Sequence, residues 1–205
     1  MIKNDKWITQ QATKGMITPF VPQLVRKAEA RPAGLVSDSP IRYKAISYGL
    51  SSYGYDIRLS PNDFRIFRHV PGTVIDPKNF SNDNLEPAHL HRGERGDYFI
   101  LPGHSYGLGV AVERLAMPGN VTGVCLGKST YARVGIIVNM TPAEAGWCGH
   151  LTLEFSNSSS ADCRLYVNEG VAQMLFFEGE RCATTYEDRS GKYQGQPEQV
   201  VIAKV

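Results

Sequence analysis

From residue 47 onward, short runs of apolar, aromatic and β-branched residues recur, and glycine, proline, asparagine and aspartate separate them. Runs of this length with turn residues between them are typical of an all-β sandwich or barrel. The pattern predicts strands at residues 55–59, 64–67, 98–101, 106–112, 121–126, 135–140, 151–155, 163–167 and 171–177.

The N-terminal part of the chain has a different pattern. Asn4 and Asp5 precede apolar residues and Gly15 follows them, which predicts a short helix over residues 4–15. Prolines then interrupt the chain and predict a loop-rich arm, with a helical turn near residues 23–28; they are Pro19, Pro22, Pro32 and Pro40. We expect one domain over residues 1–205, with this arm at 1–46, a β-barrel core at 47–186 and a polar C-terminal tail at 187–205.

Composition limits the classes of partner. The chain has 205 residues, a hydrophobic content of 42% and a charged content of 20%, which are the values of an ordinary globular protein. A net charge of +2 is too small to predict a nucleic-acid surface. The N-terminus lacks the apolar stretch of a signal peptide, and no apolar run approaches the length of a membrane span. We therefore expect a cytoplasmic protein with neither nucleic acid nor membrane as a partner.

The segment 127–133, with the sequence GKSTYAR, concentrates hydrogen-bond donors. Its glycine allows close approach of the backbone to an anion, and four side chains can donate to that anion: Lys128, Ser129, Thr130 and Arg133. The alternative is a solvated turn that caps a short helix near 131–133, but the clustering favours an anion site. A P-loop is excluded because the motif needs a glycine where Thr122 stands.

Glu154 is the candidate general base. Apolar and polar residues alternate through the segment 150–155, which places Glu154 on the polar face of a strand. A carboxylate on a strand among apolar residues acts as an acid or base if that face lines a cleft, and is an ordinary surface residue if it faces solvent. The pattern alone leaves both alternatives open.

The sequence does not support zinc-dependent deamination. The nucleobase deaminases that use zinc carry H-x-E followed by P-C-x-x-C, and neither half occurs in this chain. Only His89 and His91 have a spacing suited to a metal, and they lie in a hydrophilic stretch without a third ligand nearby. We therefore expect no zinc site.

Five segments together resemble the family of dCTP deaminases: SSYGYDIR at 51–58, GKSTYAR at 127–133, GHLTLEFSN at 149–157, EGVAQ at 169–173 and GKYQGQ at 191–196. The resemblance implies a mainly β fold, a distorted dUTPase-like barrel of short strands, assembled as a homotrimer with active sites between subunits. It also implies conversion of dCTP to dUTP and ammonia without zinc, with Mg²⁺ accompanying the triphosphate. Inhibition by dTTP occurs in the family and is a further expectation.

The resemblance also implies roles for single residues. Glu154 matches the acid/base, and Ser129 and Arg133 match residues that position the attacking water. The rest of the turn, namely Lys128, Thr130, Tyr131 and Ala132, would hold phosphate oxygens through side chains or backbone amides. The remaining matches are contacts to the base, sugar or triphosphate: Thr152, Leu153, Gln173, Tyr186, Lys192 and Gln196, with Lys192 on a tail that closes over the nucleotide.

The sequence leaves open the role of Glu144 and the choice among three functions. Glu144 lies where some members of the family carry an aspartate before a tryptophan, so it is either a neighbour of the substrate site or an ordinary loop carboxylate. The leading function is a dCTP deaminase that supplies dUTP. The alternatives are a dUTP diphosphatase or bifunctional enzyme on the same fold, and a catalytically silent nucleotide-binding regulator.

Overall fold

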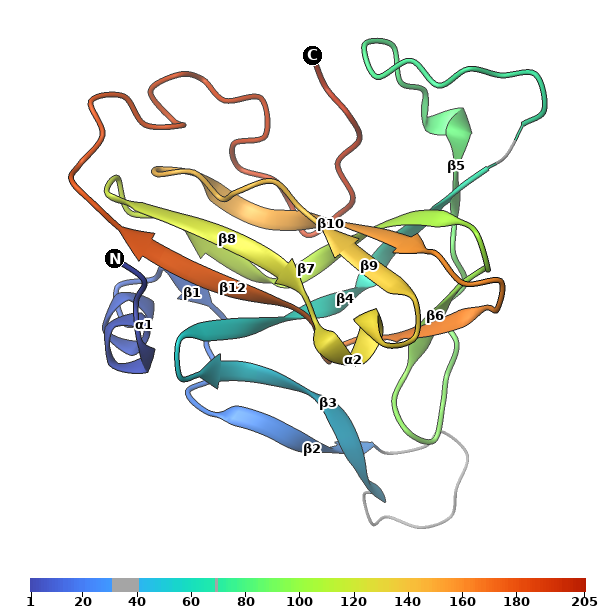
Figure 1. Ribbon diagram of the computed structural model, residues 1–205, viewed down its shortest axis with the longest axis horizontal. Coiled ribbons are helices and arrows are strands. Elements are labelled where there is room, and N and C mark those ends of the chain that lie inside the picture. The colour runs from blue at the N-terminus through green and yellow to red at the C-terminus, as the bar shows by residue number, and fades with distance from the viewer. Residues whose placement is uncertain (31–40, 69) are drawn as a thin grey trace.

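The computed structural model describes residues 1–30, 41–68 and 70–205, and antiparallel strands form most of its regular secondary structure (Figure 1). The helices are α1 (Asp5–Ala12), α2 (Ser129–Ala132) and the 3-10 helix η1 (Asn82–Asn84). The strands are β1 (Ile17–Thr18), β2 (Leu24–Ala30), β3 (Ile41–Ser51), β4 (Gly54–Phe67), β5 (Leu85–Pro87), β6 (Tyr98–Leu101), β7 (Tyr106–Ala116), β8 (Val121–Gly127), β9 (Ile136–Asn139), β10 (Cys148–Asn157), β11 (Cys163–Tyr166) and β12 (Gly170–Glu178).

The large sheet determines where the site lies. Its strands follow the order β2-β3-β4-β7-β10-β9, and β12 pairs with both β4 and β8. Strand β10 therefore lies between β7 and β9, and its residues 154–156, which include Glu154, pair with both neighbours. A smaller sheet pairs β6 with β11.

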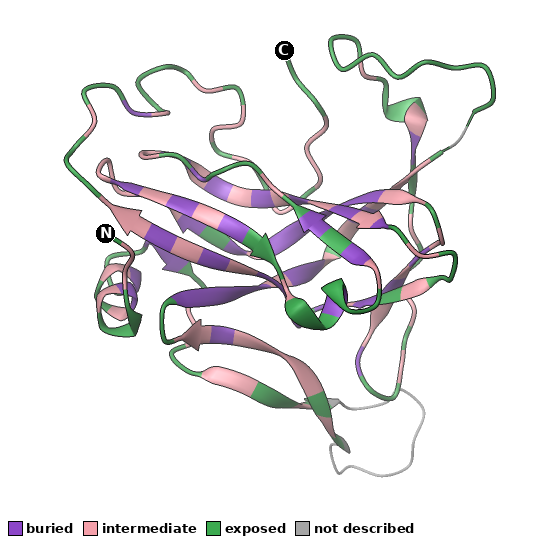
Figure 2. Ribbon diagram, in the orientation of Figure 1, coloured by how far each residue is buried: buried purple, intermediate pink, exposed green. Residues whose placement is uncertain are grey.

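The core fills the space enclosed by these strands, and Figure 2 shows the buried residues along β4, β7, β10 and β12. Tyr55, Ile57 and Leu59 of β4 are fully buried, as are Phe155 of β10 and Phe176 of β12. Burial of each such side chain contributes about 1.5–3 kcal/mol to folding. Their spacing of two along each strand confirms the mainly β prediction.

Helix α1 confirms the predicted N-terminal helix. The side chain of Asn4 caps it by accepting a hydrogen bond from the backbone N–H of Trp7 at 3.1 Å. Ile8 and Ala12 are its buried residues. Gly15 follows with a φ of +90°, a conformation that favours glycine and ends the helical run.

The helical turn predicted near residues 23–28 is wrong. The structure has strand β2 there, and β2 pairs with β3 from Leu24 opposite Gly49 to Ala30 opposite Ile41. Lys27, Ala28 and Glu29 are good helix formers, but pairing with a neighbouring strand overrides this intrinsic preference. Strand pairing thus begins before residue 47, while the part of the predicted arm with Pro32 and Pro40 lies outside the described residues.

The strands predicted at 55–59 and 64–67 form one strand, β4. Its pairing with β7 shifts register between Leu59 and Phe64, and this irregularity accounts for the apparent break in the sequence pattern. The other predicted strands are present within a few residues of their expected ends. Within the described ranges, no helix has the length and apolar character needed to cross a bilayer.

Candidate active site

Glu154 faces a cavity. On β10 the buried residues Leu151, Leu153 and Phe155 alternate with the half-buried Thr152 and Glu154. Thr152 and Glu154 line a cavity of about 670 Å³, whose walls are mainly apolar. The polar face of this strand therefore borders a cleft, and the role of Glu154 as a base stays a prediction.

Burial raises the pKa of the Glu154 carboxyl group above its ordinary value. The side chain of Asn139, on the neighbouring strand β9, opposes this shift because its Nδ2 donates a hydrogen bond of 3.3 Å to Glu154 Oε2. The result is a carboxyl group with a raised proton affinity on a cavity wall, as expected for a general base that works near neutral pH.

The C-terminal segment 186–205 forms another wall of the cavity. Its backbone joins β10 because Gly195 N–H donates to Cys148 O at 2.8 Å and His150 N–H donates to Gln196 O at 3.0 Å. Side chains add to this docking: Thr152 Oγ1 donates to Gln196 Oε1 at 3.0 Å. The predicted contacts Thr152 and Gln196 thus lie together beside Glu154.

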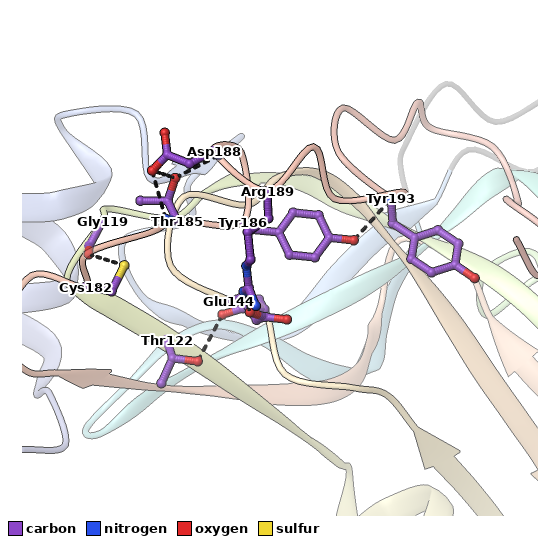
Figure 3. Close-up of polar contacts among 10 residues, drawn as sticks. Gly119, Thr122, Glu144, Cys182, Thr185, Tyr186, Asp188, Arg189 and Tyr193 are labelled. Atoms are coloured by element: carbon purple, nitrogen blue, oxygen red, sulfur yellow. Dashed lines mark hydrogen bonds and ion pairs between the residues drawn. The ribbon is translucent and has the colours of Figure 1, made fainter. Parts of the chain in front are cut away.

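Tyr186 and Lys192, two more predicted contacts, line the same cavity. Figure 3 shows the hydroxyl of Tyr186 directed at the backbone of Tyr193, whose N–H donates to it at 3.0 Å. Lys192 Nζ donates to Lys204 O at 2.6 Å, so the ammonium group is held within the C-terminal segment.

Glu144 also lines this cavity, and Figure 3 shows it against Arg189, with which it forms an ion pair. Both side chains are about half exposed, and ion pairs so open to water contribute little stability. The pair nevertheless links the loop before Trp147 to the C-terminal segment.

The turn 127–133 is built separately, at the junction of β8 and α2. Lys128 is the N-cap residue of α2, and its ammonium group forms an ion pair with the buried Asp56 of β4. Gln173 Nε2 donates to the other oxygen of Asp56 at 3.0 Å. Two predicted nucleotide contacts therefore share one buried carboxylate, whose role the sequence reasoning missed although Asp56 lies within the segment 51–58.

The remaining residues of the turn point outward. Ser129, Thr130, Ala132 and Arg133 are exposed, and Arg133 Nη1 donates to Ser129 O at 3.1 Å. Tyr131 is the exception because it is buried and its hydroxyl accepts the N–H of Tyr166 at 2.9 Å. The side chains of Tyr131 and of the fully buried Leu153 thus belong to the core, so only their backbone groups are left for a ligand.

Within one chain, the turn of residues 127–133 does not reach the Glu154 cavity. In the β9–β10 pairing Glu154 lies opposite Asn139, whereas the end of β9 next to α2, Ile136, lies opposite Asn157. Three residues of strand separate these positions by about 10 Å. None of residues 128–133, all of them described, lines the Glu154 cavity, and neither does Gln173.

Comparison with known proteins identifies the family. A family model described as dCTP deaminase-like matches residues 2–179. A curated dCTP deaminase of Azoarcus sp. (strain BH72) is 50% identical over 197 residues, which cover 95% of each chain. That of Dechloromonas aromatica is 48% identical over 206 residues and covers 100% of this chain and 99% of its own. This chain belongs to the dCTP deaminase-like family.

A solved structure agrees with the fold of the family. The crystal structure of 2'-deoxycytidine 5'-triphosphate deaminase from Agrobacterium tumefaciens aligns with a TM-score of 0.55 and 16% identity. The alignment covers 87% of this chain but only 48% of that one, so the chain spans about half of its length. At this identity the similarity concerns the fold alone, and it confirms the mainly β architecture.

Proposed function

We propose that this protein hydrolyses the 4-amino group of dCTP and releases dUTP and ammonia. Close similarity to curated dCTP deaminases over nearly the whole chain supports the substrate and the reaction. The observation that supports the reaction chemistry is the position of Glu154: its carboxyl group is half-buried on the wall of a cavity and has a raised pKa.

In the proposed mechanism the Glu154 carboxylate takes a proton from water as the water oxygen adds to C4 of cytosine. Glu154 then passes this proton to N3, takes the second proton from the new hydroxyl group on C4, and delivers it to the amino nitrogen. The bond from C4 to that nitrogen breaks, ammonia leaves, and the 4-oxo group of uracil remains. The desolvation that raises the pKa of Glu154 makes it a stronger base, and a positioned base contributes about 10²- to 10⁴-fold.

We further propose that the site is completed by a neighbouring chain in a homotrimer. The exposed Ser129 and Arg133 would then reach the Glu154 cavity of the next subunit and position the water there. Apolar side chains flank this turn in exposed positions: Leu126 is 50% exposed, Val134 54% and Ile137 56%. Exposed apolar side chains that cluster on a surface are typical of a protein–protein interface. In the proposed trimer the turn of each chain would contact the cavity of the next chain, and three such head-to-tail contacts would close a ring.

The triphosphate would lie between Lys192 of the C-terminal segment and the donors of that neighbouring turn. We propose that residues 187–205 close over it as a tail. The described residues contain no cluster of three or more Asp, Glu, His or Cys side chains that fits a metal. Mg²⁺, which readily binds phosphate oxygens and keeps several waters, would therefore arrive with the nucleotide and neutralise part of its charge. Because dTTP carries the same sugar and triphosphate, it would compete for this cavity.

A second activity, hydrolysis of dUTP to dUMP and pyrophosphate, is favoured by one observation. Glu144 places another carboxylate on the wall of the cavity, which Lys192 and Trp147 also line. Incubation with dCTP and Mg²⁺, followed by identification of the products, separates the candidates. Production of dUTP and ammonia supports the deaminase, dUMP and pyrophosphate show the second activity, and absence of ammonia contradicts the proposal.

A further inference from the structure

Tyr106 of β7 lies beside Glu154 on the side opposite Asn139. In the β7–β10 pairing Tyr106 is opposite Ser156 and Glu154 is opposite Leu108, which makes Tyr106 and Glu154 diagonal neighbours. Side chains two residues apart on a strand share a face, and diagonal neighbours lie about 7–8 Å apart, within reach of a tyrosine. Both residues line the cavity, so this face of the sheet is their common surface.

Aromatic packing fixes the ring of Tyr106. The ring of Phe67, from β4, meets it edge-on with centroids 5.0 Å apart and an angle of 81° between planes. Phe67 in turn packs against Phe80 at 5.7 Å. A ring held on one side by such contacts has few alternative orientations, which favours a defined position for its hydroxyl.

The charge of the Glu154 carboxylate acts on the phenol of Tyr106. Desolvation, and after it the negative charge of Glu154, raises the pKa of Tyr106 to about 12. Tyr106 therefore keeps its proton throughout the neutral range and can donate a hydrogen bond to an ionised carboxylate.

We propose that Tyr106 is a positioning residue of the proposed deaminase: its hydroxyl, which makes no hydrogen bond to Glu154 in this structure, turns to donate to the Glu154 carboxylate from the β7 side, while Asn139 already donates from the β9 side. The two donors aim the carboxylate into the cavity and favour its ionised form. The inference rests on the proposed function only for the role of Glu154 as base.

The other ionisable groups of the cavity come from other elements and have other partners. Glu144, from the loop before β10, pairs with Arg189, and Lys192 is held by the carbonyl of Lys204. Tyr186 accepts a hydrogen bond from the backbone of Tyr193, whose own hydroxyl accepts one from Lys204 N–H at 3.0 Å. Tyr106 is thus the ionisable side chain that lies next to Glu154 on the neighbouring strand.

The test is a pH titration, followed by NMR, of the side-chain carboxyl carbon of Glu154 in the full chain. The signal is assigned by its loss in the variant Glu154→Gln. Tyr106→Phe keeps the ring and removes the hydroxyl, so the pKa of Glu154 should rise by about half to one unit. Tyr53→Phe, at a tyrosine that is 54% exposed, removes a hydroxyl elsewhere and should leave that pKa unchanged.

The acid limb of the pH profile of kcat/KM should move upward by the same amount in Tyr106→Phe. An unchanged or lower pKa of Glu154 in this variant overturns the inference. The titration does not require turnover, so it decides the role of Tyr106 even if the wild-type protein fails to deaminate dCTP. That failure would contradict the proposed function separately.

Discussion

The Glu154 cavity and the turn of residues 127–133 differ in how one chain completes them. The cavity is enclosed by β7, β10, the loop before Trp147 and the C-terminal segment, and it collects Thr152, Tyr186, Lys192 and Gln196. The turn instead presents Ser129 and Arg133 outward, beyond the end of β9 that lies three strand residues away from Glu154. Residues that belong to one predicted site thus occupy two surfaces, which is the reason for proposing that two chains share the site.

The sharpest contrast within the cavity is between its two carboxylates. We expect Glu154→Gln to lower kcat by at least about 10²- to 10⁴-fold, because it removes the proposed base while keeping the shape and most polar contacts. Glu144→Gln is the matched control, since Glu144 lines the same cavity but pairs with Arg189, and we expect less than about a tenfold loss.

Steady-state ammonia release measures both variants, and equilibrium binding of dCTP verifies that the cavity still accepts the nucleotide. If Glu154→Gln turned over dCTP at nearly the wild-type rate, Glu154 could not be the general base.

The pH dependence tests the electrostatics of the same wall. The base must be ionised, so kcat/KM should fall as the pH drops through the pKa of Glu154, which burial raises above that of an ordinary glutamate. Asn139→Leu removes the hydrogen bond that favours the ionised form, so the acid limb should move upward by about one unit, and kcat/KM at low pH should fall about tenfold. An acid limb that does not move would show that Asn139 has no influence on the base.

A buried acid near the turn gives the corresponding test in the other region. Glu169, just before β12, is 3% exposed and accepts a hydrogen bond of 2.6 Å from the N–H of Ile46. Desolvation raises its pKa to about 7. A raised pKa means that the folded state disfavours the charged form, so the protein loses stability as the pH rises from about 4 to about 7.

Glu169→Gln should remove this loss. We expect the variant to be more stable than the wild type by about 2 kcal/mol at pH 8, with little difference at pH 5. Urea unfolding at the two pH values measures this, and parallel stability curves would contradict a buried, titrating Glu169.

Much of the fold could be predicted because each strand carries its own signal. Residues 98–101 were predicted as a strand and form β6 with the same ends. Strand β2 could not be predicted, because most of its residues favour a helix and its pairing with β3 is a contact that no local pattern reveals. The sequence also did not reveal that β4 is one continuous strand, because the break in its pattern is a register shift in the pairing with β7.

The position of Glu154 could be predicted from the sequence, but the cavity around it could not. Alternation along β10 placed Glu154 on the polar face, but the cavity depends on the loop before Trp147 and on the docked C-terminal segment, which no local pattern reveals. Asp56 and Asn139 were missed for the same reason, since their partners Lys128 and Glu154 are distant in sequence or on another strand. The homotrimer stays a prediction.

The most direct measurement is complementation between Glu154→Gln and Arg133→Ala. Each variant alone should be inactive, or nearly so, because each site then lacks the base or the cation. In equimolar mixed trimers formed by co-expression, about a quarter of the sites would combine an intact Glu154 with an intact Arg133 from the next chain. The account predicts deaminase activity near that fraction of the wild type, whereas mixed trimers as inactive as the separate variants would contradict a site shared between chains.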